Sequence, residues 1–101
     1  MKIVWSEFSQ IALKEIFNYY KKFAEKSIAN KIKNQILLST KHLEDNPEMG
    51  QKEFLLDDLN ENHCYILTGN YKVIYKITEN HILITDVFDT RQNPVKMNKL
   101  R

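Results

Sequence analysis

The sequence predicts a single α+β domain over residues 1–101, with an N-terminal strand and an antiparallel helical hairpin packed on a curved, mainly antiparallel sheet of about four strands. Its 101 residues are enough for one small hydrophobic core. Apolar residues recur at helical spacing in the first half and in short β-type runs in the second half. Two glycines and two prolines are too few for a collagen-like or low-complexity chain.

The first strand is predicted at residues 2–5, where Ile, Val and Trp favour a pleated, half-buried surface. Ser6 follows as the expected N-cap of a helix, with the negative charge of Glu7 in its first turn. Apolar side chains then repeat along one face at helical spacing. The members of this stripe are Phe8, Ala12, Ile16, Tyr19 or Tyr20, and Phe23.

A second helix is expected to begin at Ser27, whose hydroxyl is a suitable cap. Its apolar stripe consists of Ile28, Ile32, Ile36 and Leu43. Asn46-Pro47 and Gly50 end it, since proline and glycine interrupt helices. Two helices joined by a few residues form an antiparallel hairpin with facing stripes, and we expect these stripes to pack in the core.

The second half contains three β-type runs, at residues 63–68, 71–77 and 82–88. Gly69-Asn70 and Glu79-Asn80 separate them and have the composition of tight turns. This spacing predicts an antiparallel meander. Several runs are apolar on both faces, which indicates that at least one strand is central and covered on both sides.

Several functional classes are excluded by composition. The single Cys64 rules out an intramolecular disulfide framework and a cysteine-rich zinc site. His42, His63 and His81 lack metal-ligand spacing, so we expect neither a metal nor a cofactor. No apolar run approaches the ~20 residues that span a bilayer, and we expect a cytoplasmic protein.

The net charge of +2 is too small to indicate a nucleic-acid-binding protein, but the charges are unevenly distributed. Residues 53–61 carry four acids and no base. The tail after Thr90 is purely basic, and it is either a solvated end or an anion-binding rim. Its charged residues are Arg91, Lys96, Lys99 and Arg101.

The two lysines in the run at residues 71–77 also have two possible interpretations. Lys72, Ile74 and Lys76 point to one side of this strand. That side is either an exposed face on which lysine stems cover apolar neighbours, or a basic surface that binds an anionic partner. Arg91 either pairs with Asp89 or recognises a phosphate or carboxylate.

The order and spacing of these motifs resemble the RelE/ParE superfamily of toxins from bacterial type II toxin–antitoxin systems. Trp5-Ser6-Glu7-Phe8 opens the first helix, and the segments GNYKVIYKI (residues 69–77) and VFDTRQNP (residues 87–94) follow in the sheet region. The resemblance covers nearly the whole chain. It implies a compact α+β toxin neutralised by a cognate antitoxin. RelE-like members cleave mRNA on the ribosome, whereas ParE-like members poison DNA gyrase.

For the RelE-like alternative, a metal-independent endoribonuclease, the resemblance implies catalytic roles for Lys72 and Arg91. His63, which opens a strand of the candidate face, is either a structural residue or the acid or base of this reaction. The stretch from Gln92 to Arg101 contains no Tyr or His, and Cys64 stands in a stretch where relatives carry a basic residue. The acid–base set is therefore incomplete, which favours a ParE-like toxin that acts by binding. A further alternative is a non-toxic relative that only binds antitoxin.

For target or antitoxin binding we expect one basic platform near the C-terminal end of the sheet, formed by Lys72, Lys76, Arg91 and Lys96. An acidic antitoxin segment that folds on binding would contact this platform or the apolar side of the helical hairpin.

Overall fold

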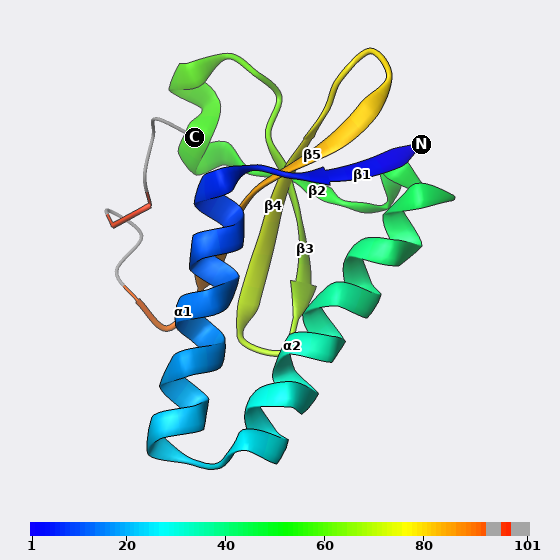
Figure 1. Cartoon of the computed structure of the whole chain (residues 1–101). Coiled ribbons are helices and arrows are strands. Elements are labelled where there is room, and N and C mark those ends of the chain that lie inside the picture. Colours follow the sequence, from blue (N-terminus) through cyan, green and yellow to red (C-terminus); the bar gives the residue numbers. More distant parts are fainter. Residues whose placement is uncertain (93–95, 98–101) are drawn as a thin grey trace.

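The computed structural model describes residues 1–92 and 96–97 and confirms the α+β class (Figure 1). An N-terminal strand, two long helices and a sheet follow one another along the chain. The strands are β1 (Lys2–Trp5), β2 (Gln51–Lys52), β3 (Cys64–Thr68), β4 (Tyr71–Ile77) and β5 (His81–Asp89). The helices are α1 (Glu7–Phe23) and α2 (Lys26–Lys41), with short 3-10 helices η1 (His42–Glu44), η2 (Pro47–Met49) and η3 (Phe54–Leu59).

The sheet has five strands in the order β1-β5-β4-β3-β2. β1 runs parallel to β5, and the other neighbouring strands are antiparallel. β5 and β4 are therefore interior strands, in agreement with their apolar character on both faces. The fifth strand, β2, was not predicted, because two polar residues carry no periodic signal.

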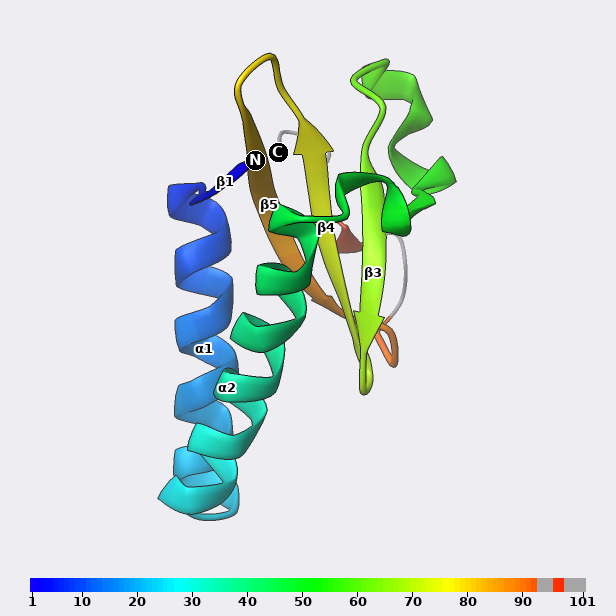
Figure 2. The ribbon, with the colours of Figure 1, turned by 90° about the vertical axis from the view of Figure 1, so that its right-hand side faces the viewer.

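The helical hairpin covers one face of this sheet, and the segment containing η3 lies on the other side (Figure 2). Ser6 caps α1 as predicted, since its side chain accepts a hydrogen bond from the backbone N–H of Ser9 at 3.1 Å. The predicted cap of the second helix was wrong. Glu25 is the N-cap, in extended conformation, and Ser27 already lies in the first turn of α2.

α2 ends at Lys41, two residues before the last member of its predicted stripe. Leu43 lies instead in η1, where it is fully buried, so its predicted core role is confirmed although the helix type differs. β4 has the predicted bounds, whereas β3 begins one residue later than predicted and leaves His63 just before it.

The larger core cluster fills the space between the helices and the sheet. Its buried members include Ile36, Leu43, Val73, Tyr75 and Ile84. A smaller cluster of Leu56, Ile74, Phe88 and Met97 lies on the outer face, beneath η3. Both faces of β4 are thus covered, but the outer cover is much smaller.

A β-bulge in β5 separates two parts of this strand. Ile74 pairs with Asp86 while the next residue, Tyr75, pairs with Ile84, which leaves Thr85 as an extra residue. β1 pairs with β5 only up to Ile84. Beyond the bulge, β5 therefore faces α1 rather than β1.

Within residues 1–92 and 96–97, no helix combines the length and apolar character needed to cross a membrane. The same residues contain no group of three or more His, Cys, Asp or Glu side chains arranged to hold a metal ion.

Candidate functional site

The lysines of β4 lie on the outer face of the sheet, where acidic residues meet them. Lys72 Nζ is 2.8 Å from Glu53 Oε2 and 4.3 Å from the ring centroid of Tyr65. Glu53 is buried and is the N-cap of η3, where its Oε1 accepts a hydrogen bond from the backbone N–H of Leu55. The ion pair therefore joins η3 to the centre of the sheet.

Two more ion pairs tie the acidic stretch to basic side chains. Lys76 Nζ lies 3.2 Å from Glu61 Oε2, and Lys52 Nζ lies 3.4 Å from Asp57 Oδ1. Glu53, Asp57 and Glu61 of the acidic stretch thus pair with lysines of β2 and β4. The positive charge that the sequence places on this strand face is largely balanced within the chain.

His63 lies beside these pairs, and its side chain is fully buried. Its Nε2 is 3.9 Å from Glu61 Oε2. In this position the imidazole is shielded from solvent, so a substrate in solution does not reach it without a local rearrangement. The Cys64 thiol follows, and its half-buried position raises its pKa and lowers its reactivity.

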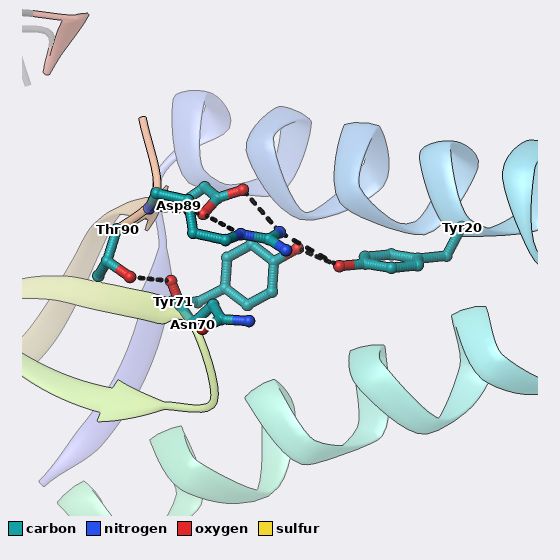
Figure 3. A network of polar contacts seen from close by, with 6 residues as sticks. Tyr20, Asn70, Tyr71, Asp89 and Thr90 are labelled. Carbon is teal, nitrogen blue, oxygen red and sulfur yellow. Dashed lines mark hydrogen bonds and ion pairs between the residues drawn. The ribbon is translucent and has the colours of Figure 1, made fainter. Parts of the chain in front are cut away.

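Arg91 lies in a separate network that joins β5, β4 and α1. Figure 3 shows Asp89, Tyr71 and Tyr20 of this network. Its Nε and Nη2 donate to the two carboxylate oxygens of Asp89, each at 2.9 Å, a bidentate arrangement. Nη2 also lies 3.4 Å from the hydroxyl of Tyr20, which accepts a hydrogen bond from the Tyr71 hydroxyl at 3.1 Å. Asp89 additionally accepts from the backbone N–H of Arg91. The predicted pairing of Arg91 with Asp89 is confirmed.

This network shifts the acidities of its members in opposite directions. The hydrogen bonds from Tyr71 and Arg91 lower the pKa of Tyr20, because they stabilise the phenolate. Burial raises the pKa of Tyr71. The hydrogen bond from Arg91 lowers the pKa of Asp89, so this carboxylate stays ionised and held at neutral pH.

A groove opens between α1 and the part of β5 beyond the bulge; we call it the α1–β5 groove. It has a volume of about 630 Å³. One wall of the groove is a row of mostly apolar side chains on α1, and residues 86–89 form its floor. Arg91 and Lys96 line the end of the groove that is nearest to the C-terminal segment. The residues of the wall are Phe8, Ile11, Ala12, Glu15, Ile16 and Tyr19.

The structure therefore divides the predicted basic platform into two places. Lys72 and Lys76 lie on the outer face, in contact with η3 and Glu61. Arg91 reaches Tyr20 on the helix side, and it lines the α1–β5 groove together with Lys96. The expectation of one continuous platform was wrong, because Lys72 and Lys76 pair with acids over the outer face of β4, whereas Arg91 lies beyond the end of β5 and turns toward α1. Lys99 and Arg101 lie outside the described residues.

Sequence reasoning assigned neither Tyr71 nor Tyr20 of this network to a site; Tyr20 is the one that contacts Arg91. It was placed only in the apolar stripe of the first helix, as an alternative to Tyr19. Its contact with Arg91 joins residues 71 positions apart. Periodicity within one helix carries no signal for such a long-range contact.

Fold and site together define a small α+β protein with an apolar groove and balanced internal ion pairs. The family model described as "ParE toxin of type II toxin-antitoxin system, parDE" matches residues 3–94. The chain therefore belongs to the ParE toxin family, which confirms the resemblance drawn from its motifs.

A solved structure described as "Chromosomal ParDE TA system from P. aeruginosa" has the same fold, with a TM-score of 0.74. Its sequence is 14% identical, and the match covers 88% of this chain and 95% of that one. No curated protein matches the chain in sequence.

Proposed function

We propose that this ParE-family toxin arrests bacterial growth in the cytoplasm by binding DNA gyrase, and that a cognate antitoxin neutralises it. The observation that carries the proposal is the internal pairing of the cations. Lys72, Lys76 and Arg91 each have a carboxylate partner within the chain. A ribonuclease needs cations available to the crowded phosphate of its transition state, and here a carboxylate competes with that phosphate at each position.

The α1–β5 groove supports the antitoxin part of the proposal. Phe8, Ile11 and Tyr19 are 41%, 50% and 55% exposed, respectively, along one row of α1. Exposed apolar rows of this kind mark protein–protein contact surfaces. Lys96 at the end of the groove, which takes part in no ion pair within the described residues, would attract an acidic, apolar antitoxin segment that orders on binding.

The target is tested with one purified preparation in two assays: supercoiling by gyrase, and transcript cleavage on translating ribosomes. We expect inhibition of supercoiling, which the cognate antitoxin relieves, and intact transcripts with or without that antitoxin. Ribosome-dependent cleavage without an effect on gyrase would refute the proposed target. If bacteria that express the protein grow without arrest, the protein is a non-toxic relative that only binds antitoxin.

One observation favours ribosome-dependent mRNA cleavage as a second candidate function. Tyr20 brings a phenol of lowered pKa to the guanidinium of Arg91, although the C-terminal stretch lacks Tyr and His. A phenol beside a guanidinium can move a proton while the cation stabilises phosphate charge. This candidate requires that Asp89 give up at least one of the two hydrogen bonds that it accepts from the Arg91 guanidinium.

Tyr20→Phe separates the two candidates. For a gyrase inhibitor we expect toxicity to persist, because the aromatic ring and its packing remain. For a ribonuclease we expect cleavage to fall by about 10²–10⁴-fold, the usual contribution of a general acid or base. Tyr19→Phe is the matched control, since it removes a neighbouring hydroxyl that makes no contact with Arg91 in the described network.

A further inference from the structure

A second groove lies between the two helices, beside the end of β1; we call it the hairpin groove. Its apolar surface is formed by Trp5, Leu13, Phe17 and Leu37, and its volume is about 420 Å³. Trp5, Leu13 and Phe17 are half-buried, and Leu37 remains 37% exposed. Trp5 and Leu13 also pack against the main core, so the floor of the groove is fixed by the fold.

Two lysines flank this groove. Lys14 follows Leu13 on α1, and Lys33 on α2 places its Nζ 5.5 Å from the ring centroid of Phe17. Neither lysine takes part in an ion pair within the described part of the chain. No acidic residue lines the groove.

The charges around the hairpin groove differ from those in the other charged regions of the molecule. The lysines of β4 are matched by acids of the same chain, and the α1–β5 groove contains Glu15, Asp86 and Asp89 beside its two cations. Only the hairpin groove, of the two grooves, combines an apolar floor with cations alone. Its complementary ligand is apolar on one side and acidic at the edges.

The shape of the hairpin groove also favours a helical ligand over an extended one. A valley between two packed helices accepts a third helix, whose side chains at i, i+3, i+4 and i+7 lie between theirs. A volume of about 420 Å³ has room for a few apolar anchors. An extended strand would present alternate side chains away from the floor and leave much of it uncovered.

We propose that the hairpin groove is a second docking surface, separate from the α1–β5 groove, and that it binds an acidic amphipathic helix of a partner protein. Apolar side chains of that helix would cover Trp5, Phe17 and Leu37, and flanking carboxylates would pair with Lys14 and Lys33. The proposal does not depend on gyrase being the target.

Trp5 provides the readout, because it is the single tryptophan of the chain. The probe is a designed tryptophan-free peptide of about 18 residues, long enough for a helix, with Leu at i, i+3, i+4 and i+7 and Glu beside them. A second peptide carries Lys at each Glu position. We expect the acidic peptide to shift Trp5 emission saturably, and the basic peptide to leave it unchanged.

Two variants of equal charge change test the lysines. Lys14→Glu with Lys33→Glu should weaken the acidic peptide by about tenfold. Lys22→Glu with Lys31→Glu, which alters exposed lysines outside the groove, should leave the affinity within about twofold at moderate salt. Thermal unfolding of both double variants establishes that the fold is retained. If the first pair destabilises the chain, Lys14→Gln with Lys33→Gln replaces it, with an expected loss of about threefold.

Three results would overturn the proposal. The acidic peptide leaves Trp5 emission unchanged, both peptides bind equally well, or the groove and control variants lose affinity equally. The first result removes the docking surface altogether. The other two remove the charge complementarity on which the choice of an acidic helix rests.

Discussion

The two faces of the sheet are covered by very different means, although β4 passes through the centre of both. On the helix face, large apolar side chains and tyrosine rings fill the space beneath two long helices. On the outer face, a four-residue apolar cluster and three ion pairs connect the short η3 segment to the strands. The first cover is mainly hydrophobic, whereas the second combines a small core with charge pairing.

This difference teaches how a strand with two lysines should be interpreted. Lys72 and Lys76 occupy positions that a nucleic-acid-binding sheet could use, yet each meets a glutamate from residues 53–61. When an acidic segment of the same chain packs over a basic strand, the lysines of that strand belong to a packed surface and not to an open binding surface. Within the described residues, the lysines of the helical hairpin take part in no ion pair.

The largest expected effect is a loss of stability, and it allows the apolar clusters on the two faces of the sheet to be compared directly. Leu43→Ala on the helix face and Leu56→Ala on the outer face remove the same atoms from positions with 0% and 1% exposure. We expect losses of about 4 and about 2 kcal/mol in the free energy of unfolding, because the smaller cluster can collapse around its cavity more easily. Denaturant titration measures both. An equal or larger loss for Leu56→Ala would break the comparison.

The next effect concerns the buried member of the outer ion pairs. Glu53→Gln leaves Lys72 without its carboxylate in a position where only 22% of the lysine side chain is exposed. We expect a loss of about 1–3 kcal/mol, less than for a fully buried pair because solvent still reaches the ammonium group. Urea unfolding of Glu53→Gln, Lys72→Met and the double variant gives the coupling.

For that pair, the double variant should lose less than the sum of the two single variants. Glu61→Gln is the control, since its partner Lys76 belongs to a more exposed pair and we expect a loss within about 1 kcal/mol. Additive losses for Glu53 and Lys72 would show that the pair does not hold η3 on the sheet.

A smaller effect on the helix face should be present at neutral pH and should diminish at alkaline pH. Burial raises the pKa of Tyr75 to about 12, and its hydroxyl donates to the carbonyl of Pro47 and accepts from the N–H of Gly50. Because the folded chain holds this proton more tightly than the unfolded chain, the contribution is complete below pH ~10 and is lost as pH rises toward 12.

Tyr75→Phe should therefore cost about 1 kcal/mol at neutral pH and show a shallower fall in stability between pH ~10 and ~12. Chemical denaturation across that range measures both slopes. The same slope in both proteins would place the alkaline transition at another group.

The smallest effect concerns the edge of the sheet, where β2 covers β3. Cys64 pairs with Lys52 in the sheet, and burial raises the pKa of its thiol. Iodoacetamide should alkylate Cys64 at pH 7.5 more slowly than a free cysteine peptide, and at the peptide rate once the chain is unfolded in urea. Equal rates in the folded chain would mean that β2 leaves the thiol accessible.

The parts of the fold with strong local patterns could be predicted from the sequence. β1, β4 and the Ser6 cap have their predicted positions because each depends on neighbouring residues alone. The two-residue β2 has no pattern to detect. The cap at Glu25 depends on its backbone conformation, whereas serine at position 27 is the better cap by residue type.

The candidate site was harder to predict because charges pair through space. Arg91 with Asp89 is a local pair, and it was among the expected alternatives. Lys72 with Glu53 spans 19 residues, and composition shows both charges without showing that they meet. The distribution of cations between packed and available surfaces follows from such contacts, so only the three-dimensional arrangement reveals it.

The parallel pairing of β1 with β5 joins the first and the last of the described strands, with Lys2 opposite His81. The sheet therefore cannot be completed until residues 81–89 have left the ribosome, although β2, β3 and β4 precede them in the chain. Until then, the apolar stripes of both helices lack the part of the sheet that β1 and β5 form together. Any protein that recognises those stripes can bind the nascent chain before it acquires its finished shape.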